Sequence, residues 1–316
     1  MRLLAFAAFL VPLPNHALAG QYSLEDTYQG ANFFSMFQFV AGSDPTHGRV
    51  NYVPEDVALG GSLALVSGSG DAIIRVDNTT FLSASGPGRN SVRIESNKLY
   101  DTHVSVFDIV HMPQGCGTWP AIWENGANWP AGGEIDILEG VNNQIQNLVT
   151  LHTTSGCSMP PSRDMIGSNT GLDCNAGVNF NAGCGVRLPG ISYGTAFNVN
   201  GGGWYAIERT STFVAVWFWG RNSASIPGEM TNGSNLINTD NWGIPAAYFP
   251  NTSCDIGLHF GPASININIA LCGDWAGNSA VYAASGCPGT CIDFVDNNPA
   301  AFTDAFFEFS WIKVYS

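Results

Sequence analysis

Three carboxylates lie within six residues of one another in the segment Glu134-Ile135-Asp136-Ile137-Leu138-Glu139. Two glycines precede this segment and one follows it, which argues against a helix because glycine destabilises helices by about 1 kcal/mol relative to alanine. The isoleucines favour a β-strand. Side chains alternate between the two faces of a strand, so Glu134 and Asp136 are expected to share one face.

Glu139 follows Asp136 by three residues, so strict alternation would turn it to the opposite face. One extra residue at Ile137–Leu138, a β-bulge, would restore it to the face of Asp136. The sequence therefore predicts a bulged strand with three carboxylates in a row.

Three adjacent carboxylates repel one another unless one is protonated or the site uses their charge. Hydrolysis of a glycosidic bond needs such a group of residues, since one carboxylate attacks the sugar and one carboxylic acid protonates the leaving oxygen. We expect Glu139 to stay protonated to higher pH because of its anionic neighbours. The alternative is a surface strand that is acidic by chance.

The rest of the chain predicts many strands to hold this segment. Its 37 glycines and 17 prolines indicate frequent turns. Alternating segments predict strands at 49–53, 72–76, 91–96, 103–110 and 264–271. A further strand is expected at 147–153, a hairpin at 204–210 with 213–219, and a closing strand at 306–315. Segment 147–153 is expected to pair antiparallel with the acidic strand, and the polar face of 264–271 is expected to be wet. The fold class is all-β, a two-sheet sandwich.

The acidic segment resembles the E-x-D-x-x-E signature of glycoside hydrolase family 16, in the bulged form of its laminarinases. The preceding run 111–123 (HMPQGCGTWPAIW) is also similar to that family, closest to secreted fungal endo-1,3(4)-β-glucanases. The resemblance implies a concanavalin-like β-jelly roll, with two curved antiparallel sheets and a substrate cleft on the concave face. It also implies an endo-acting, retaining enzyme for β-1,3-glucans, with mixed β-1,3/1,4-glucans as a further substrate. Glu134 would be the nucleophile, Glu139 the acid/base, and Asp136 a neighbour that tunes Glu134.

Aromatic rings stack on the apolar faces of sugars, while polar groups meet their hydroxyls. On these grounds and by resemblance, the expected substrate-binding residues are Arg93, Trp123, Trp129, His152, Trp275, Asn51 and Asn268. For Arg93 the alternative is a strand arginine paired with a surface acid, and for His152 a structural histidine. Trp119 is interpreted as a core residue.

Composition limits the remaining possibilities. The formal net charge of −14 disfavours binding to nucleic acid or to an anionic membrane. Residues 1–19 read as a signal peptide and 20–316 as a single catalytic domain, which predicts a secreted protein. Eight cysteines then predict up to four disulfides of undetermined pairing, with a zinc site as the rival interpretation. We expect a β-glucan ligand, a monomer, and neither cofactor nor catalytic metal; three N-glycosylation sequons begin at Asn78, Asn232 and Asn251.

Three other functions are alternatives to the hydrolysis of glucans. A cell-wall β-glucan transglycosylase would use the same carboxylates, but such fungal relatives more often carry the unbulged E-x-D-x-E. A non-hydrolytic β-glucan-binding protein on the same fold would lose the glutamates that are present here. The run 190–194 matches the G-x-S-x-G of serine hydrolases, yet it lacks the preceding strand and following helix that this motif requires.

Overall fold

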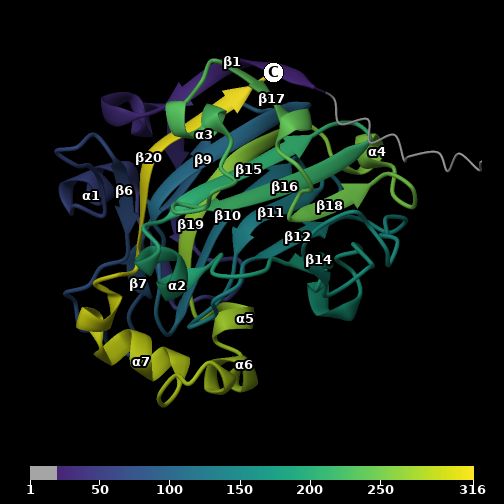
Figure 1. The fold of residues 1–316 in the computed structure, drawn as a ribbon. Helices are drawn as coiled ribbons and strands as arrows, with labels where there is room; N and C mark the ends of the chain where they lie inside the picture. The colour runs from purple at the N-terminus through teal and green to yellow at the C-terminus, as the bar shows by residue number, and fades with distance from the viewer. Residues whose placement is uncertain (1–19) are drawn as a thin grey trace, which may run out of the picture.

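The computed structural model describes residues 20–316, so the predicted signal peptide at 1–19 lies outside the described residues. Two large antiparallel sheets form the molecule, as Figure 1 shows, which confirms the all-β fold class. A short third sheet adds β3 (Gly42–Ser43), β4 (Val50–Tyr52) and β7 (Arg89–Ser91).

The eight-stranded sheet has the order β13-β14-β12-β11-β10-β19-β8-β2. Its strands are β2 (Phe37–Phe39), β8 (Arg93–Ser96), β10 (Thr118–Gly126), β11 (Glu134–Glu139), β12 (Leu148–His152), β13 (Ser168–Asn169), β14 (Cys184–Arg187) and β19 (Ala263–Leu271). The acidic segment is thus β11, and β12 is its antiparallel neighbour, as the sequence predicts.

The nine-stranded sheet has the order β17-β1-β20-β9-β15-β16-β18, with β6 pairing to β20 and β5 pairing to β6. Its strands are β1 (Gln21–Tyr28), β5 (Ala64–Val66), β6 (Ala72–Arg75), β9 (His103–His111), β15 (Gly203–Arg209), β16 (Phe213–Gly220), β17 (Leu236–Asn238), β18 (Ala247–Pro250) and β20 (Phe306–Tyr315). The predicted hairpin is β15–β16, and the predicted closing strand is β20.

Helices in the described residues are short, with at most seven residues each. They are α1 (Glu55–Gly60), α2 (Gly194–Val199), α3 (Gly228–Asn232), α4 (Ile256–His259), α5 (Gly273–Ala276), α6 (Ser279–Ala284) and α7 (Cys291–Asn297). Figure 1 shows α5, α6 and α7 gathered at one end of the sandwich. No helix within residues 20–316 has the length and apolar character needed to cross a membrane.

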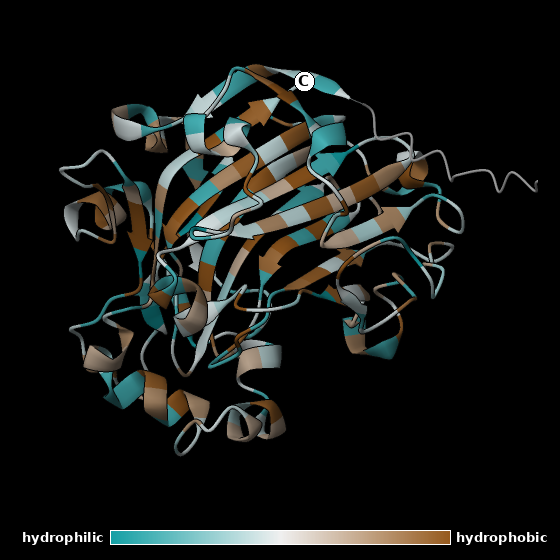
Figure 2. Ribbon diagram, in the orientation of Figure 1, coloured by the Kyte–Doolittle hydropathy of each residue, from teal (hydrophilic) through white to brown (hydrophobic). Residues whose placement is uncertain are grey.

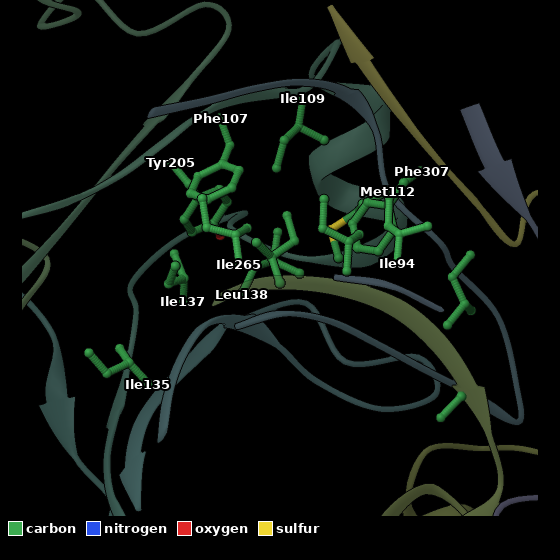
Figure 3. Packing of buried hydrophobic residues seen from close by; sticks show 14 of the residues in the cluster. Ile94, Phe107, Ile109, Met112, Ile135, Ile137, Leu138, Tyr205, Ile265 and Phe307 are labelled. Carbon is green, nitrogen blue, oxygen red and sulfur yellow. The ribbon is translucent and has the colours of Figure 1, made fainter. Parts of the chain in front are cut away.

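The main core lies between the two sheets. Figure 3 shows Ile135, Ile137 and Leu138 of β11 in the same apolar cluster as Phe107 and Ile109 of β9. The strands alternate in hydropathy, as the banded colouring of Figure 2 shows, because successive side chains point to opposite faces. Non-directional burial of this kind is the largest favourable term in folding.

The opposite face of the nine-stranded sheet has an apolar cluster of its own. Trp217 and Trp219 of β16 pack edge-on against Trp242, with ring centroids 5.3 and 5.6 Å apart. The same cluster includes Met230 of α3 and Ile237 of β17. The segment that carries α3 and β17 therefore covers this face and keeps its aromatic side chains out of water.

Four disulfides account for all eight cysteines, so the interpretation of the cysteines as ligands of a zinc ion is wrong. The pairs are Cys116–Cys287, Cys157–Cys254, Cys174–Cys184 and Cys272–Cys291. Two of them hold the long irregular region between β12 and β15, and the other two hold the helical segment that follows β19. Such bonds stabilise by limiting the unfolded chain, typically by about 2–4 kcal/mol each.

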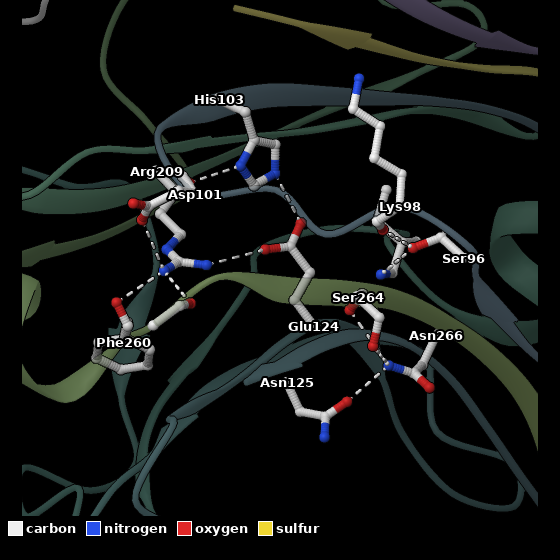
Figure 4. A network of polar contacts seen from close by, with 12 residues as sticks. Ser96, Lys98, Asp101, His103, Glu124, Asn125, Arg209, Phe260, Ser264 and Asn266 are labelled. Atoms are coloured by element: carbon white, nitrogen blue, oxygen red, sulfur yellow. Dashed lines mark hydrogen bonds and ion pairs between the residues drawn. The ribbon is translucent and has the colours of Figure 1, made fainter. Parts of the chain in front are cut away.

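A buried charged cluster joins the two sheets, as Figure 4 shows. Glu124 of β10 accepts from His103 of β9 at 2.9 Å and lies 4.0 Å from the guanidinium of Arg209 of β15. All three side chains are at most 2% exposed. Arg209 also donates to the carbonyls of Phe260 and Gly261 at 2.8 and 2.6 Å.

This cluster fixes the segment against which the start of β11 packs. Gly261 donates its N–H to the carbonyl of Gly132 at 3.1 Å. Gly133 has φ of +75°, and a Cβ there would lie 2.4 Å from the ring of Phe260. Only glycine fits this close approach, so the glycines before the acidic segment set where the strand begins.

One prediction about β19 is wrong. Its polar face was expected to be wet, yet all nine residues of the strand are buried. Asn266 is 0% exposed, and its amide NH₂ donates to Asn125 Oδ1 at 2.8 Å, while Asn268 is 9% exposed. Buried amides keep their hydrogen bonds by pairing across strands, so an alternating pattern does not by itself indicate exposure.

Candidate active site

The predicted β-bulge is present in β11. The pairing with β10 shifts between Asp136 and Leu138, which leaves Ile137 as an extra residue. Ile137 and Leu138 are both 0% exposed and both belong to the core cluster. Two successive residues therefore face the core, and Glu139 returns to the face that carries Asp136.

Asn147, which the sequence analysis did not identify, holds this bulge. Its side-chain oxygen accepts from the N–H of Glu139 at 2.7 Å, and its amide donates to the carbonyl of Ile137 at 2.8 Å. These are backbone groups that a bulge takes out of the regular ladder. Asn147 is itself fully buried, and its N–H donates to Ser192 Oγ at 2.9 Å. Ser192, the serine of the G-x-S-x-G run, is 0% exposed, so the serine-hydrolase alternative is wrong.

A cleft of about 480 Å³ lies over β11, with all three carboxylates in its wall. Its volume is within the usual range for small-molecule sites, about 300–1,000 Å³. Of the seven predicted substrate-binding residues, four line it: Arg93, Trp123, Trp129 and Asn268.

The other three do not line the cleft. Asn51 donates to Asn90 at 2.7 Å within the small third sheet. Trp275 packs edge-on against Trp119, a residue of the cleft wall, with ring centroids 5.8 Å apart. His152 lies beside Asp136 on the neighbouring strand β12.

The prediction that Trp119 is a core residue is wrong. It is only partly buried, lines the cleft, and donates its indole N–H to Glu139 Oε1 at 2.8 Å. It occupies β10, one strand away from Glu139, in a position where side chains alternate between core and cleft. A tryptophan in such a strand fits either face, and only the register decides which.

Trp129 donates its indole N–H to Glu134 Oε2 in the same way, so each glutamate has its own indole donor. The adjoining wall is built by Arg93, whose guanidinium lies 5.0 Å from the ring of Trp123. Trp123 in turn donates to Asn268 Oδ1 at 2.7 Å. The Arg93 Nε is buried and has no hydrogen-bond partner.

Burial perturbs all three carboxyl groups. It raises the pKa of Glu134 to about 8, with the charge of Asp136 as the second cause. Burial likewise raises the pKa of Asp136 to about 7, and a hydrogen bond from Glu134 opposes this shift. The pKa of Glu139 lies well above its usual value, again through burial first and Asp136 second, while the bond from Trp119 lowers it. The direction for Glu139 agrees with the sequence analysis, but burial outweighs the anionic neighbours that we had expected to cause it.

His152 comes from β12 and faces the middle carboxylate. Its Nε2 lies 3.3 Å from Asp136 Oδ2, and its Nδ1 lies 2.8 Å from Asn181 Oδ1. Glu134, Asp136 and His152 offer ligand atoms that all lie within 4.8 Å of one another. This is the part of the site with the side chains to hold a metal ion.

The sequence does not identify several further residues that line the cleft, most of which lie far along the chain from the acidic segment. They are Asp44, Pro45, Thr46, Asn125, Asn181, Ala270 and Asp274. The segment 44–48 (DPTHG) has the residues of a turn. Nothing in its sequence indicates that it lines the cleft over β11. His47 Nδ1 lies 3.0 Å from Asp274 Oδ2, and both side chains are exposed.

Comparisons with known proteins agree with this geometry. A family model described as "XgeA-like, catalytic GH16 domain" matches residues 37–315. A probable endo-1,3(4)-β-glucanase of Aspergillus clavatus is 43% identical over 303 residues, which cover 93% of this chain and 46% of the relative. The chain thus spans about half the length of this curated relative.

In two solved structures, the region similar to this protein covers the full length of the solved chain. Laminarinase 16A from Phanerochaete chrysosporium, described with β-glucans in both donor and acceptor sites, has a TM-score of 0.92 and 54% identity over 94% of this chain. An elongating family 16 β-1,3-glucosyltransferase has a TM-score of 0.87 and 40% identity over 93% of this chain. The jelly-roll fold is therefore common to all three proteins.

Proposed function

The chain belongs to glycoside hydrolase family 16, and on that premise we propose that it is an endo-acting β-glucanase that hydrolyses β-1,3-glucans by a retaining mechanism. The observation that carries the proposal is the bulged strand β11, which brings Glu134, Asp136 and Glu139 to one cleft wall. Mixed β-1,3/1,4-glucan is the second substrate class, in keeping with the names of the curated relatives.

The two glutamates take different parts in double displacement. Glu134 attacks the anomeric carbon and forms a glycosyl-enzyme, while Glu139 protonates the leaving oxygen and then removes a proton from the incoming water. Asp136 shares a hydrogen bond with Glu134 and so adjusts its charge. Burial keeps Glu139 protonated, which suits its first role as an acid.

The order of strands supports binding of a polymer on both sides of the scissile bond. β12 lies on one side of β11, and β10, β19 and β8 lie on the other. A glucan that crosses β11 meets Arg93 and Trp123 with one arm and the region of Asn181 with the other. Stacking on the tryptophans and hydrogen bonds at the rim would hold its rings. Of the remaining predicted residues, His152 would position Asp136, Trp275 would brace Trp119, and Asn51 has no contact that assigns it a role.

We further propose that the protein is secreted and acts as a monomer. Four disulfides support an oxidising compartment, because such bonds are rare in the reducing cytosol. Size-exclusion chromatography with light scattering tests the monomer, and peptide mass mapping of the secreted protein tests cleavage after residue 19 and glycan occupancy at the three sequons.

The test of the function is product analysis. The mature protein and its Glu134→Gln variant are incubated with laminarin, lichenan and carboxymethyl cellulose, and the oligosaccharides are resolved. Short products from laminarin, absent with the variant, are the expected result, and the lichenan lane reports on mixed-linkage substrate. Retention on insoluble β-1,3-glucan without any products would instead indicate a binding protein.

Transglycosylation is the second candidate, because a glucosyltransferase shares 40% identity and the same fold with this chain. The same incubation distinguishes the two. Products longer than the starting oligosaccharide at low substrate concentration would establish a transferase, whereas reducing ends that increase with time establish hydrolysis.

A further inference from the structure

The group formed by Glu134, Asp136 and His152 has the composition of a transition-metal site. One imidazole and two carboxylates offer atoms that lie within 4.8 Å of one another. Zinc binds such ligands at about 2.0–2.2 Å and favours tetrahedral geometry. Magnesium and calcium prefer oxygen ligands in larger numbers, so they fit this group poorly.

The spacing of two of the ligand atoms matches that geometry. Asp136 Oδ2 and His152 Nε2 are 3.3 Å apart. In a tetrahedron with bonds of about 2.0–2.1 Å, neighbouring ligands are separated by about 3.3 Å. The third ligand, Glu134, sits on a partly exposed side chain at the cleft wall, and small rotations about its side-chain bonds would bring its carboxylate to the metal.

A second observation concerns the direction of the lone pairs. Asn181 Oδ1 accepts from the Nδ1–H of His152 at 2.8 Å, so the neutral imidazole carries its free lone pair on Nε2, facing Asp136. Asp136 is 2% exposed, and its Oδ2 receives no hydrogen bond. Two lone pairs that face one another at this distance repel unless a proton or a cation lies between them. Metal-binding histidines are typically held in this manner, through the nitrogen that does not bind the metal.

We propose that Glu134, Asp136 and His152 bind one divalent transition-metal ion, typified by Zn²⁺, and that the bound ion inhibits hydrolysis reversibly. The inhibition follows because Glu134 cannot attack a sugar while its carboxylate binds the metal. The inhibition of hydrolysis rests on the proposed function, whereas the binding of the metal does not. Substrate and metal compete, since both need the same carboxylate at the cleft wall.

The chain offers a matched control in His47 and Asp274. They form a histidine–carboxylate pair with nearly the same separation, 3.0 Å, but their side chains are 80% and 64% exposed. This pair supplies two ligands instead of three and has no counterpart to Asn181. It therefore tests whether any histidine–carboxylate pair near the cleft would give the same result.

Binding is measured by isothermal titration calorimetry with Zn²⁺ and by the visible absorption of Co²⁺ in the same site. The expected result is one ion per chain, with the intense bands of four-coordinate Co²⁺. His152→Gln should weaken Zn²⁺ binding by more than about 100-fold, and Asn181→Ala by about 10–100-fold, as expected for loss of a ligand and of its outer partner. His47→Gln should leave the affinity unchanged. Circular dichroism checks that each variant is folded.

Inhibition is measured as the rate of reducing-end release from laminarin in the presence of Zn²⁺. The apparent inhibition constant should rise with laminarin concentration, and a chelator should restore the rate. The inference is overturned if the wild-type protein binds no zinc, if His47→Gln removes binding, or if Mg²⁺ binds as tightly. A protein that binds zinc through His152 but cleaves no glucan would contradict the proposed function and not the metal site.

Discussion

Replacement of Asn147 by alanine tests how the bulge positions the acid/base. Asn147 is fully buried and makes two bonds to β11, to Glu139 N–H and to Ile137 C=O. The variant leaves both backbone groups buried without a partner, at about 1–3 kcal/mol each. The free energy of unfolding should therefore fall by roughly 2–5 kcal/mol. The upper figure is below the sum of the two largest costs because the strand can relax. Displacement of a catalytic group by about 1 Å can cost about 100-fold in rate, so kcat should fall by that order.

The control is Asn198→Ala. Asn198 also holds both backbone groups of one residue, Met112 N–H and C=O, each at 2.9 Å, but it lies away from the cleft. Stability is measured by urea unfolding, and kcat on a soluble laminarin oligosaccharide at a temperature where both variants are folded. The reasoning predicts destabilisation in both variants and a large loss of kcat only for Asn147→Ala. A destabilised Asn147→Ala variant with wild-type kcat would show that the asparagine does not position Glu139.

Three further predictions follow from single contacts. The indole N–H of Trp119 favours the charged form of Glu139 and so lowers the pKa of that carboxyl. Trp119→Phe removes this hydrogen bond, so the pKa of Glu139 should rise further and the alkaline limb of kcat/KM should move to higher pH. A limb that stays in place would refute this role. Arg209→Met leaves the buried carboxylate of Glu124 without the guanidinium and should lower the free energy of unfolding by about 3–5 kcal/mol. The control is Lys98→Met, which breaks an ion pair whose lysine is 45% exposed and should cost about 0.2–1 kcal/mol. Equal losses of stability in urea unfolding would contradict this distinction between buried and exposed pairs. Phe180 is fully exposed with φ of 56°, so Phe180→Gly should relieve about 1–2 kcal/mol of left-handed strain against about 0.5–1 kcal/mol of added chain entropy, and the melting temperature should hold or rise slightly.

The sequence predicts those parts of the site that depend on local order. Within β11, the period of two and the extra residue at Ile137 together require a bulge if Asp136 and Glu139 are to share a face. Both facts lie within six residues of sequence. The same is true of β15 and β16, two runs rich in aromatic and β-branched residues whose short connection predicts a hairpin.

Contacts between distant segments were beyond reach. Nothing near Asn147 shows that it completes the hydrogen bonds of the bulge, because its partners are set by the pairing of β11 with β12. Trp119 illustrates the same limit, since an indole on an alternating strand can face core or cleft. The buried amides of β19 show that a polar pattern indicates a distinct face and does not indicate how much water reaches it.

The most direct test of the account is to identify the residue that becomes covalently attached to the sugar. A 2-deoxy-2-fluoro laminaribiosyl donor with an activated leaving group slows the second displacement, so the glycosyl-enzyme accumulates and its peptide can be sequenced by mass spectrometry. The account predicts one label per chain, on Glu134. A label on Glu139 would reverse the two roles, and first products of inverted anomeric configuration with no label would contradict double displacement altogether.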